Sequence, residues 1–215
     1  MEYNIDKHQG EERSQRIMGF IDTVKARAKA NKKSIVLPEG MDVRIYEAAS
    51  KCIAEDIADI TIIASPAEVE ANNKGFDISK ATIIDPATSE KTQSYAEKLA
   101  ELRKSKGMTV EQAKELLLSD YMYFACMMVK LGDADGVVSG ACHSTANTLR
   151  PSLQILKTKP GSKLVSAFFL MVVPNCEYGA NGTFIFADSG LEQNPDPEKL
   201  AAIAASSAES FQLLV

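Results

Sequence analysis

The amino-acid sequence predicts an α/β protein with one α/β domain over residues 1–160 and the start of a second, incomplete α/β domain over 161–215. Short β-branched runs alternate with longer segments that have the apolar spacing of helices, which is typical of a parallel sheet. Near the end of the chain two strand-like runs stand next to each other instead. Between these two patterns, residues 158–163 are rich in Lys, Pro and Gly and predict the linker.

The first elements predict a helix followed by a β-turn-α unit. Residues 15–30 have helical periodicity and end at a polar Asn-Lys-Lys segment. Residues 34–38 form a short apolar strand, closed by Pro38-Glu39-Gly40. Apolar residues between 45 and 53 then recur on one helical face.

The middle of the chain continues the alternation. Strands are predicted over 60–64 and 81–85, with a short helix over 66–74 between them. A further helix reaches about residue 106, and a single helix is predicted from 109 to 131. The second half of that helix is apolar all round, which indicates burial, so its methionines are assigned to the core.

The last elements predict a change from parallel to antiparallel pairing. Residues 135–140 form a fourth strand that leads into a Gly-rich turn, and a helix over 144–158 is interrupted at Pro151. Strands over 164–173 and 182–187 predict a hairpin, with Asn181-Gly182 as its turn. A final helix begins after Asn194-Pro195-Asp196-Pro197 and has no ending signal, so we expect a chain that stops inside a helix.

Composition excludes several classes of protein. The 215 residues include 45% hydrophobic residues and have a net charge of −5, which favours a globular chain and gives no reason to expect nucleic acid or an anionic membrane as partner. The longest apolar run is too short to span a bilayer. Four scattered cysteines and two histidines, His8 and His143, predict reduced thiols and no metal site, and a polar N-terminus without a signal peptide predicts a cytoplasmic location.

The strongest candidate site is the strand, turn and helix start over residues 133–151. Ligands of open α/β sheets gather at the carboxyl ends of strands, where this turn is expected. Backbone amides at the N-terminus of the following helix, with the hydroxyls of Ser144 and Thr145 as extra donors, suit a phosphate or acyl-phosphate oxygen. Helix capping explains the same hydroxyls equally well. The turn is neither a Walker loop nor a dinucleotide fingerprint, which disfavours NTPase and nicotinamide functions.

Three arginines are candidate anion ligands. Arg44 follows the first β-turn, Arg103 ends a helix beside two lysines, and Arg150 precedes Pro151. A guanidinium binds two phosphate oxygens at once. Two of them also have an ordinary alternative: Arg150 as a solvated helix residue, and Arg103 as a charge that complements a helix C-terminus.

Two further groups are weaker candidates. Cys142-His143 is a nucleophile beside a base, but sequence neighbours rarely face each other productively and nothing nearby is expected to orient His143. Asp188 ends a strand and is either a site carboxylate or a turn residue.

Taken together, several segments closely resemble the phosphate acetyltransferase (phosphotransacetylase) family, in family order, across residues 34–208. The segments that carry the resemblance are Ile35–Gly40 with Arg44, Leu102–Thr109, Asp135–Ala141 with His143–Thr145, Leu149–Pro151 with Leu153–Thr158, and Phe186–Asp188.

The resemblance implies a two-domain α/β enzyme related in fold to the isocitrate and isopropylmalate dehydrogenases, usually a homodimer. Such enzymes interconvert acetyl-CoA and phosphate with coenzyme A and acetyl phosphate in acetate metabolism. Coenzyme A is a substrate, no metal or other cofactor is implied, and monovalent cations often stimulate. By motif, Arg44, Arg103 and Arg150 are implied contacts of coenzyme A or acetyl phosphate, and Ser144 and Thr145 are implied donors to phosphate.

The chain departs from the family at its end. The family's catalytic Ser-Arg pair and aspartate base fall beyond Val215, so no catalytic residue is assigned within this chain, which is expected to be a fragment or truncated product. Two alternatives remain: a phosphate butyryltransferase, and a non-catalytic module that binds coenzyme A or acetyl-CoA.

Overall fold

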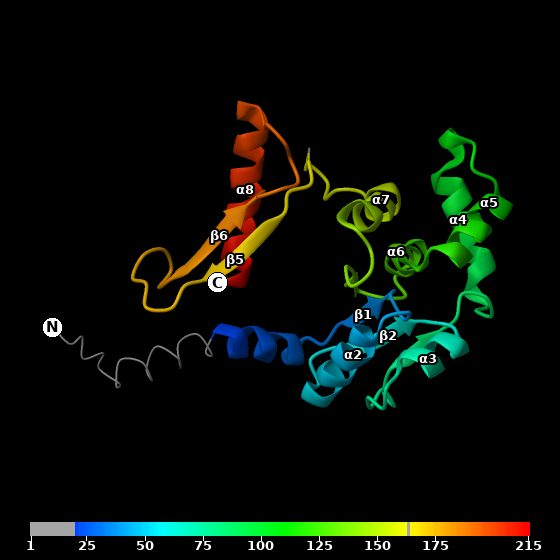
Figure 1. Cartoon of the computed structure of the whole chain (residues 1–215). Helices are drawn as coiled ribbons and strands as arrows, with labels where there is room; N and C mark the ends of the chain where they lie inside the picture. The colour runs from blue at the N-terminus through cyan, green and yellow to red at the C-terminus, as the bar shows by residue number, and fades with distance from the viewer. Residues whose placement is uncertain (1–19, 163) are drawn as a thin grey trace. The chain divides into compact units, whose positions relative to one another are not determined.

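The computed structural model describes residues 20–162 and 164–215, and these form two compact units. Ala28–Lys157 make up one unit, here called the sheet unit. Thr158–Val215, with the described residues before Ala28, make up the other, here called the hairpin unit. The start of the first predicted helix, the histidine at position 8 and the last linker residue lie outside the described residues. Helical residues 20–30 are the described part of the first helix (Figure 1).

The sheet unit is built on four parallel strands in the order β3-β2-β1-β4. These are β1 (Ser34–Leu37), β2 (Asp59–Ile63), β3 (Thr82–Ile84) and β4 (Gly136–Val137). The chain adds β2 and β3 on one side of β1 and later returns to place β4 on its other side. The strand order therefore reverses between β1 and β4, and α/β sheets bind ligands at such a switch point.

Helices cover both faces of this sheet. Successive residues of a strand point to opposite faces, and Val36 and Leu37 accordingly belong to two separate core clusters. One cluster contains residues of α2 and α3, and the other contains residues of the four later helices. The helices are α2 (Val43–Glu55), α3 (Pro66–Asn72), α4 (Lys91–Leu102), α5 (Val110–Ser119), α6 (Tyr121–Leu131) and α7 (Thr145–Ile155), with a short 3₁₀ helix over Lys104–Lys106.

The single helix predicted over 109–131 is wrong, because the structure divides it at Asp120. Asp120 has an extended backbone, and its Oδ1 accepts a hydrogen bond from the Met122 N–H at 3.0 Å, which caps α6. The burial expected for the second half is confirmed, since every residue from Met122 to Met128 is buried. Periodicity missed the break because both halves keep helical spacing.

Two predictions around the Gly-rich turn need correction. The fourth strand is only two residues long, Gly136–Val137. The helix after it is not interrupted at Pro151, because α7 runs through this buried proline to Ile155. Proline lacks one N–H, and here burial of its ring against the core compensates for the missing hydrogen bond.

The hairpin unit confirms the predicted antiparallel pairing. Strands β5 (Phe168–Val172) and β6 (Thr183–Ala187) pair in antiparallel register, and α8 (Pro197–Leu214) packs along β6 (Figure 1). Asn181 and Gly182 both have positive φ, and Ala180 and Thr183 exchange two backbone hydrogen bonds of 3.2 Å around them. Asn181-Gly182 therefore forms a tight turn, but it stands at the end of the longer connection over residues 173–182 and does not join the two strands by itself.

Candidate ligand-binding site

The candidate site lies at the carboxyl ends of β1 and β4, where the strand order reverses. Residues Pro38–Gly40 leave β1, and residues 138–144 connect β4 to α7. Gly40 allows the first turn because its neighbours leave no room for a side chain: an added Cβ would lie 2.4 Å from the Cβ of Ala64. The Gly40 carbonyl also accepts a 2.8 Å hydrogen bond from the hydroxyl of Tyr46, which fixes the turn.

Glu39 is a fully buried carboxylate that connects the two loops of the site. Its side chain is 0% exposed. Oε2 accepts from the backbone N–H groups of Gly140 and Ala141, both at 2.9 Å. Oε1 accepts from those of Cys142 and His143, at 2.7 and 2.8 Å. These four N–H groups are here called the amide cradle.

The cradle keeps Glu39 ionised in spite of its burial. Burial by itself raises the pKa of this carboxyl. The hydrogen bonds from the N–H groups of His143, Cys142 and Ala141 and from the imidazole of His143 together lower it by more, so that the net pKa falls to about 2. Successive N–H groups form a concave site for an anion, and the chain fills this one with its own carboxylate. These four loop N–H groups are therefore already bonded to Glu39. The binding of a phosphate oxygen by the amides at the N-terminus of α7 stays a prediction.

Arg44 lies at the same turn and is held by two partners. Its Nε and Nη2 donate to the carboxylate of Asp42, at 2.9 and 2.6 Å, and Nη2 also donates to the Ala141 carbonyl at 2.5 Å. Asp42 caps α2 as well, through the Arg44 N–H. The carboxylate of Asp42 raises the pKa of Arg44, and the guanidinium lowers the pKa of Asp42. Arg44 is thus a fixed cation beside the β4–α7 loop.

Ser144 and Thr145 begin α7 next to the amide cradle. Ser144 is the N-cap, and its Oγ accepts from the Asn147 N–H at 3.3 Å, so the capping interpretation is confirmed. Both side chains are exposed, and Thr145 is the first residue of the helix. A helix N-terminus favours negative charge, which is compatible with a phosphate at this position. The role of the two hydroxyls as phosphate donors stays a prediction.

A second position lies around Tyr123 of α6, where the charges of Arg103 and Arg150 both act. Burial raises the pKa of Tyr123, Asp120 adds to this, and the positive charges of Arg150 and Arg103 both oppose it. The Nε of Arg103 is buried and, among the described residues, has no hydrogen-bond partner. Arg103 lies at the end of α4 and Arg150 on α7, and the charge of each acts on the same tyrosine.

His143 connects these two positions. Its Nδ1 lies 2.8 Å from Glu39 Oε1, and its Nε2 lies 3.7 Å from Asp120 Oδ1. Because an ionised carboxylate only accepts hydrogen bonds, Nδ1 is the donor to Glu39. The expectation that nothing orients His143 is wrong: sequence reasoning missed both carboxylates.

Cys142 lacks the features of an activated nucleophile. Its thiol donates to Asp42 Oδ2 at 3.3 Å, and burial together with the charge of Asp42 raises its pKa. A reactive cysteine requires a lowered pKa. The surroundings of Cys142 therefore disfavour its thiolate and, with it, covalent catalysis by this residue.

Asp188 serves a turn in the hairpin unit. It has a positive φ of 52°, and its Oδ1 accepts from the N–H groups of Leu191 and Glu192 at 3.1 and 2.7 Å. Aspartate tolerates this backbone conformation and stabilises the turn through its side chain. The turn interpretation of Asp188 is confirmed.

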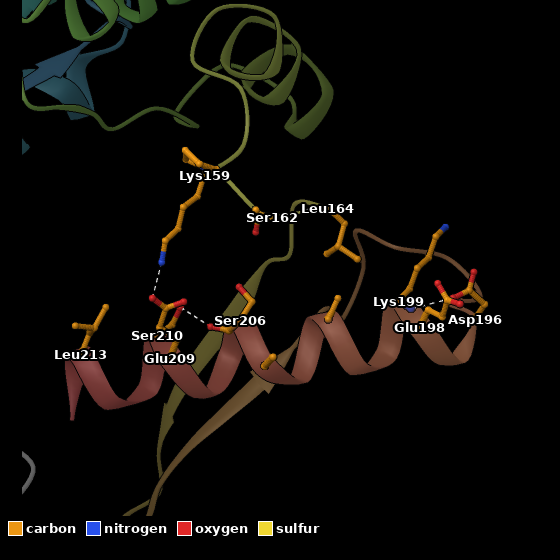
Figure 2. Close-up of a pocket in the computed structure, with 14 residues that line it drawn as sticks. Lys159, Ser162, Leu164, Asp196, Glu198, Lys199, Ser206, Glu209, Ser210 and Leu213 are labelled. Atoms are coloured by element: carbon orange, nitrogen blue, oxygen red, sulfur yellow. Dashed lines mark hydrogen bonds and ion pairs between the residues drawn. The ribbon is translucent and has the colours of Figure 1, made fainter.

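The hairpin unit also contains a groove of about 940 Å³ along α8 (Figure 2). Figure 2 shows Ser206, Glu209 and Ser210 along one side of the helix, with Lys159 reaching from the 159–164 segment to pair with Glu209. The lining mixes both charges with small residues and holds none of the predicted site residues.

In ranges 20–162 and 164–215, no three side chains of His, Cys, Asp or Glu gather as metal ligands do. None of the described helices combines the length and apolar character needed to cross a membrane.

Fold and site together define an α/β protein with an arginine and exposed hydroxyls at a switch point of its parallel sheet. The family model for "Phosphate acetyl/butaryl transferase" matches residues 19–215. The chain therefore belongs to the phosphate acetyl/butaryl transferase family.

Curated relatives and solved structures agree with this membership. Phosphate acetyltransferases of Acetivibrio thermocellus and Clostridium acetobutylicum are 52% and 45% identical over 92% of the chain. Among solved structures, phosphotransacetylases of Staphylococcus aureus and Streptococcus pyogenes align with TM-scores of 0.80 and 0.83, at 37% and 35% identity over 92% of this chain and 58% and 59% of theirs. The chain spans only 59–60% of the length of the curated relatives.

Proposed function

We propose that the protein represented by this chain is an acyltransferase that interconverts acetyl-CoA and phosphate with coenzyme A and acetyl phosphate. The observation that carries this proposal is the position of Arg44 at the β1/β4 switch point, where it donates to the loop that leads to the exposed hydroxyls of Ser144 and Thr145, in a chain of this family. Fixed cations and hydroxyl donors recognise phosphate oxygens.

The proposed mechanism is direct transfer within a ternary complex. The thiol of coenzyme A gives its proton to a carboxylate, and the resulting thiolate attacks the acetyl carbonyl carbon of acetyl phosphate. The bond from that carbon to the phosphate oxygen breaks, and phosphate leaves with the electron pair as the thioester forms. Positioning of both substrates and fixed donors for the developing charge supply the acceleration.

Within this mechanism the residues of this chain bind rather than transfer the proton. Arg44, Ser144 and Thr145 hold phosphate oxygens, and Arg103 with Arg150 hold a second anionic part, such as the phosphates of coenzyme A. The resemblance assigns the proton acceptor and the Ser-Arg pair to residues beyond Val215. For this chain alone we therefore propose binding without turnover.

The wider properties of the protein are proposals too. They comprise a two-domain arrangement like that of the isocitrate and isopropylmalate dehydrogenases, a homodimer, a cytoplasmic location, stimulation by monovalent cations, and chemistry without a metal or resident cofactor. The family relationship supports each of them.

Calorimetry on the 215-residue chain tests the central proposal. Coenzyme A and acetyl phosphate are titrated separately, and an assay of thioester formation runs on the same sample. We expect binding of at least one substrate without turnover. Binding of neither would contradict the proposal, and thioester formation would show that the catalytic groups lie within this chain.

Two alternatives follow from specific observations. The matching family includes transfer of larger acyl groups, so a butyryltransferase is the nearest competitor; a series of acyl phosphates of increasing length separates the two. The second alternative is a non-catalytic coenzyme A-binding module of the same family. Retained binding without turnover in the natural full-length protein would establish that module.

A further inference from the structure

Glu39 is an acidic residue in a place where burial opposes its charge, and the described residues hold it through N–H groups. Its side chain is fully buried, and its five hydrogen-bond partners among the described residues belong to the β4–α7 loop. They are the four N–H groups of the amide cradle and Nδ1 of His143. The carboxylate therefore acts on one loop, the loop that ends at Ser144.

We propose that Glu39 is the positioning residue of the ligand site: it serves as an internal anion that shapes residues 140–143 and so sets the place of Ser144, Thr145 and Arg44. The inference rests on the proposed function for the ligand, whereas the loop contacts stand apart from it. Glu39 itself touches no substrate, because the loop covers it.

Arg44 depends on the shape of the same loop. Its Nη2 donates to the carbonyl of Ala141, a residue whose N–H is held by Glu39. Ala141 thus donates its N–H to the Glu39 carboxylate and accepts, through its carbonyl, a hydrogen bond from the Arg44 guanidinium. Loss of the carboxylate releases this part of the loop and, with it, one of the two anchors of Arg44.

His143 extends the effect of Glu39 to a third element. Its imidazole contacts Glu39 through Nδ1 and approaches Asp120, the N-cap of α6, through Nε2. The position of Arg150 follows from α7, which starts directly after this loop. Glu39 thereby joins β1, the β4–α7 loop and the start of α6 around the site.

Glutamine is the sharpest replacement because it keeps the size of the side chain. Its single amide oxygen replaces two carboxylate oxygens. Its NH₂ group cannot accept a hydrogen bond, so the two cradle N–H groups that face it lose their acceptor. Glu39→Ala instead removes a fragment the size of acetate and leaves the cradle open for a small carboxylate. Added formate is the probe for that space.

The experiment combines amide hydrogen exchange with calorimetry on the 215-residue chain. Exchange at residues 140–143 is measured in the unchanged chain, Glu39→Gln and Glu39→Ala, with and without formate. Asp77→Asn is the matched control, since Asp77 also accepts from a backbone N–H, that of Ser79, and precedes β3 at the opposite edge of the sheet.

We expect exchange at 140–143 to accelerate about tenfold or more in both Glu39 variants, and only there, because charge-assisted hydrogen bonds are lost. Binding of acetyl phosphate weakens by about tenfold or more, and formate restores both readouts in Glu39→Ala but not in Glu39→Gln. Asp77→Asn leaves exchange at 140–143 and binding unchanged.

Three results would overturn the proposal: unchanged exchange at 140–143 in Glu39→Gln, acceleration spread evenly over the sheet unit, or unfolding of both variants that formate does not reverse. The last two would make Glu39 a general core residue. Failure of the unchanged chain to bind acetyl phosphate would refute the proposed ligand, and the exchange and formate results would still decide the role of Glu39 in the loop.

Discussion

Arg44 shows at the residue scale how a side chain on the surface gains a fixed position. The guanidinium is 64% exposed, yet it donates to both oxygens of Asp42 and to a loop carbonyl. An exposed ion pair contributes little to folding. Its fixed geometry instead serves recognition, because a preorganised guanidinium loses less entropy when it binds an anion.

We predict that Arg44→Ala weakens binding of acetyl phosphate by roughly tenfold to a hundredfold and changes the free energy of unfolding by less than about 0.5 kcal/mol. Calorimetry and urea unfolding measure the two quantities. Lys51→Ala is the control, since it removes an exposed cation paired with Glu47 on the same helix, α2. Equal losses of affinity in both variants would show that only net charge matters.

The pH dependence of the free energy of unfolding tests the lowered pKa of Glu39. Its pKa is lowered to about 2 in the folded chain from an ordinary value of 4.5. A lowered pKa gives stability that is present above pH 4.5 and is lost as pH falls through about 2, on the order of 2–3 kcal/mol in full. Urea unfolding between pH 5 and about 2 measures this loss. We expect a shallower dependence in Glu39→Gln; parallel curves for the two chains would contradict the assignment.

Sequence reasoning reached the exposed members of the site but not the buried one. Arg44, Ser144 and Thr145 follow from motifs at strand ends, and the structure brings Arg44 to the loop that precedes the two hydroxyls. Glu39 gave little signal, because an acidic residue between proline and glycine is typical of an ordinary turn. Only the pairing of β1 with β4, distant in sequence, brings the amide cradle to it.

At the element scale, α6 illustrates the limit of periodicity. Alternation of strands and helices and the final hairpin are predictable, since each depends on local apolar spacing. The break between α5 and α6 depends instead on a single side chain, Asp120, which caps one helix within a continuous apolar pattern. Pro151 shows the reverse, because core packing keeps α7 intact through a residue that usually ends a helix.

We predict that Asp120→Ala destabilises the chain by about 1 kcal/mol, through loss of the α6 cap. Urea unfolding at neutral pH measures the change. Ser119→Ala is the adjacent control, since this exposed hydroxyl only donates to the Leu116 carbonyl within its own helix, and we expect a change within about 0.5 kcal/mol. If Ser119→Ala cost as much as Asp120→Ala, the cap would not explain the break.

At the scale of the whole molecule, the hairpin unit leaves an apolar face open. The register places Phe169 opposite Phe186, and these side chains are 63% and 53% exposed. Residues of the other face, such as Leu170 and Ile185, are half-buried, and α8 packs along β6. A two-stranded ribbon has little stability of its own, and apolar residues on both faces are typical of strands that are covered on both sides.

We therefore predict that the 215-residue chain self-associates as its concentration rises, and that Phe169→Ser with Phe186→Ser shifts it toward the monomer. The reason is that association removes these rings from water, whereas serine gains nothing from it. Sedimentation measures the distribution, and urea unfolding of the same samples shows whether the fold persists. Tyr178→Ser is the control, because Tyr178 is 72% exposed in the segment between the strands and lies outside this face. A monomeric unchanged chain at every concentration, or an equal shift in Tyr178→Ser, would show that this face does not drive association.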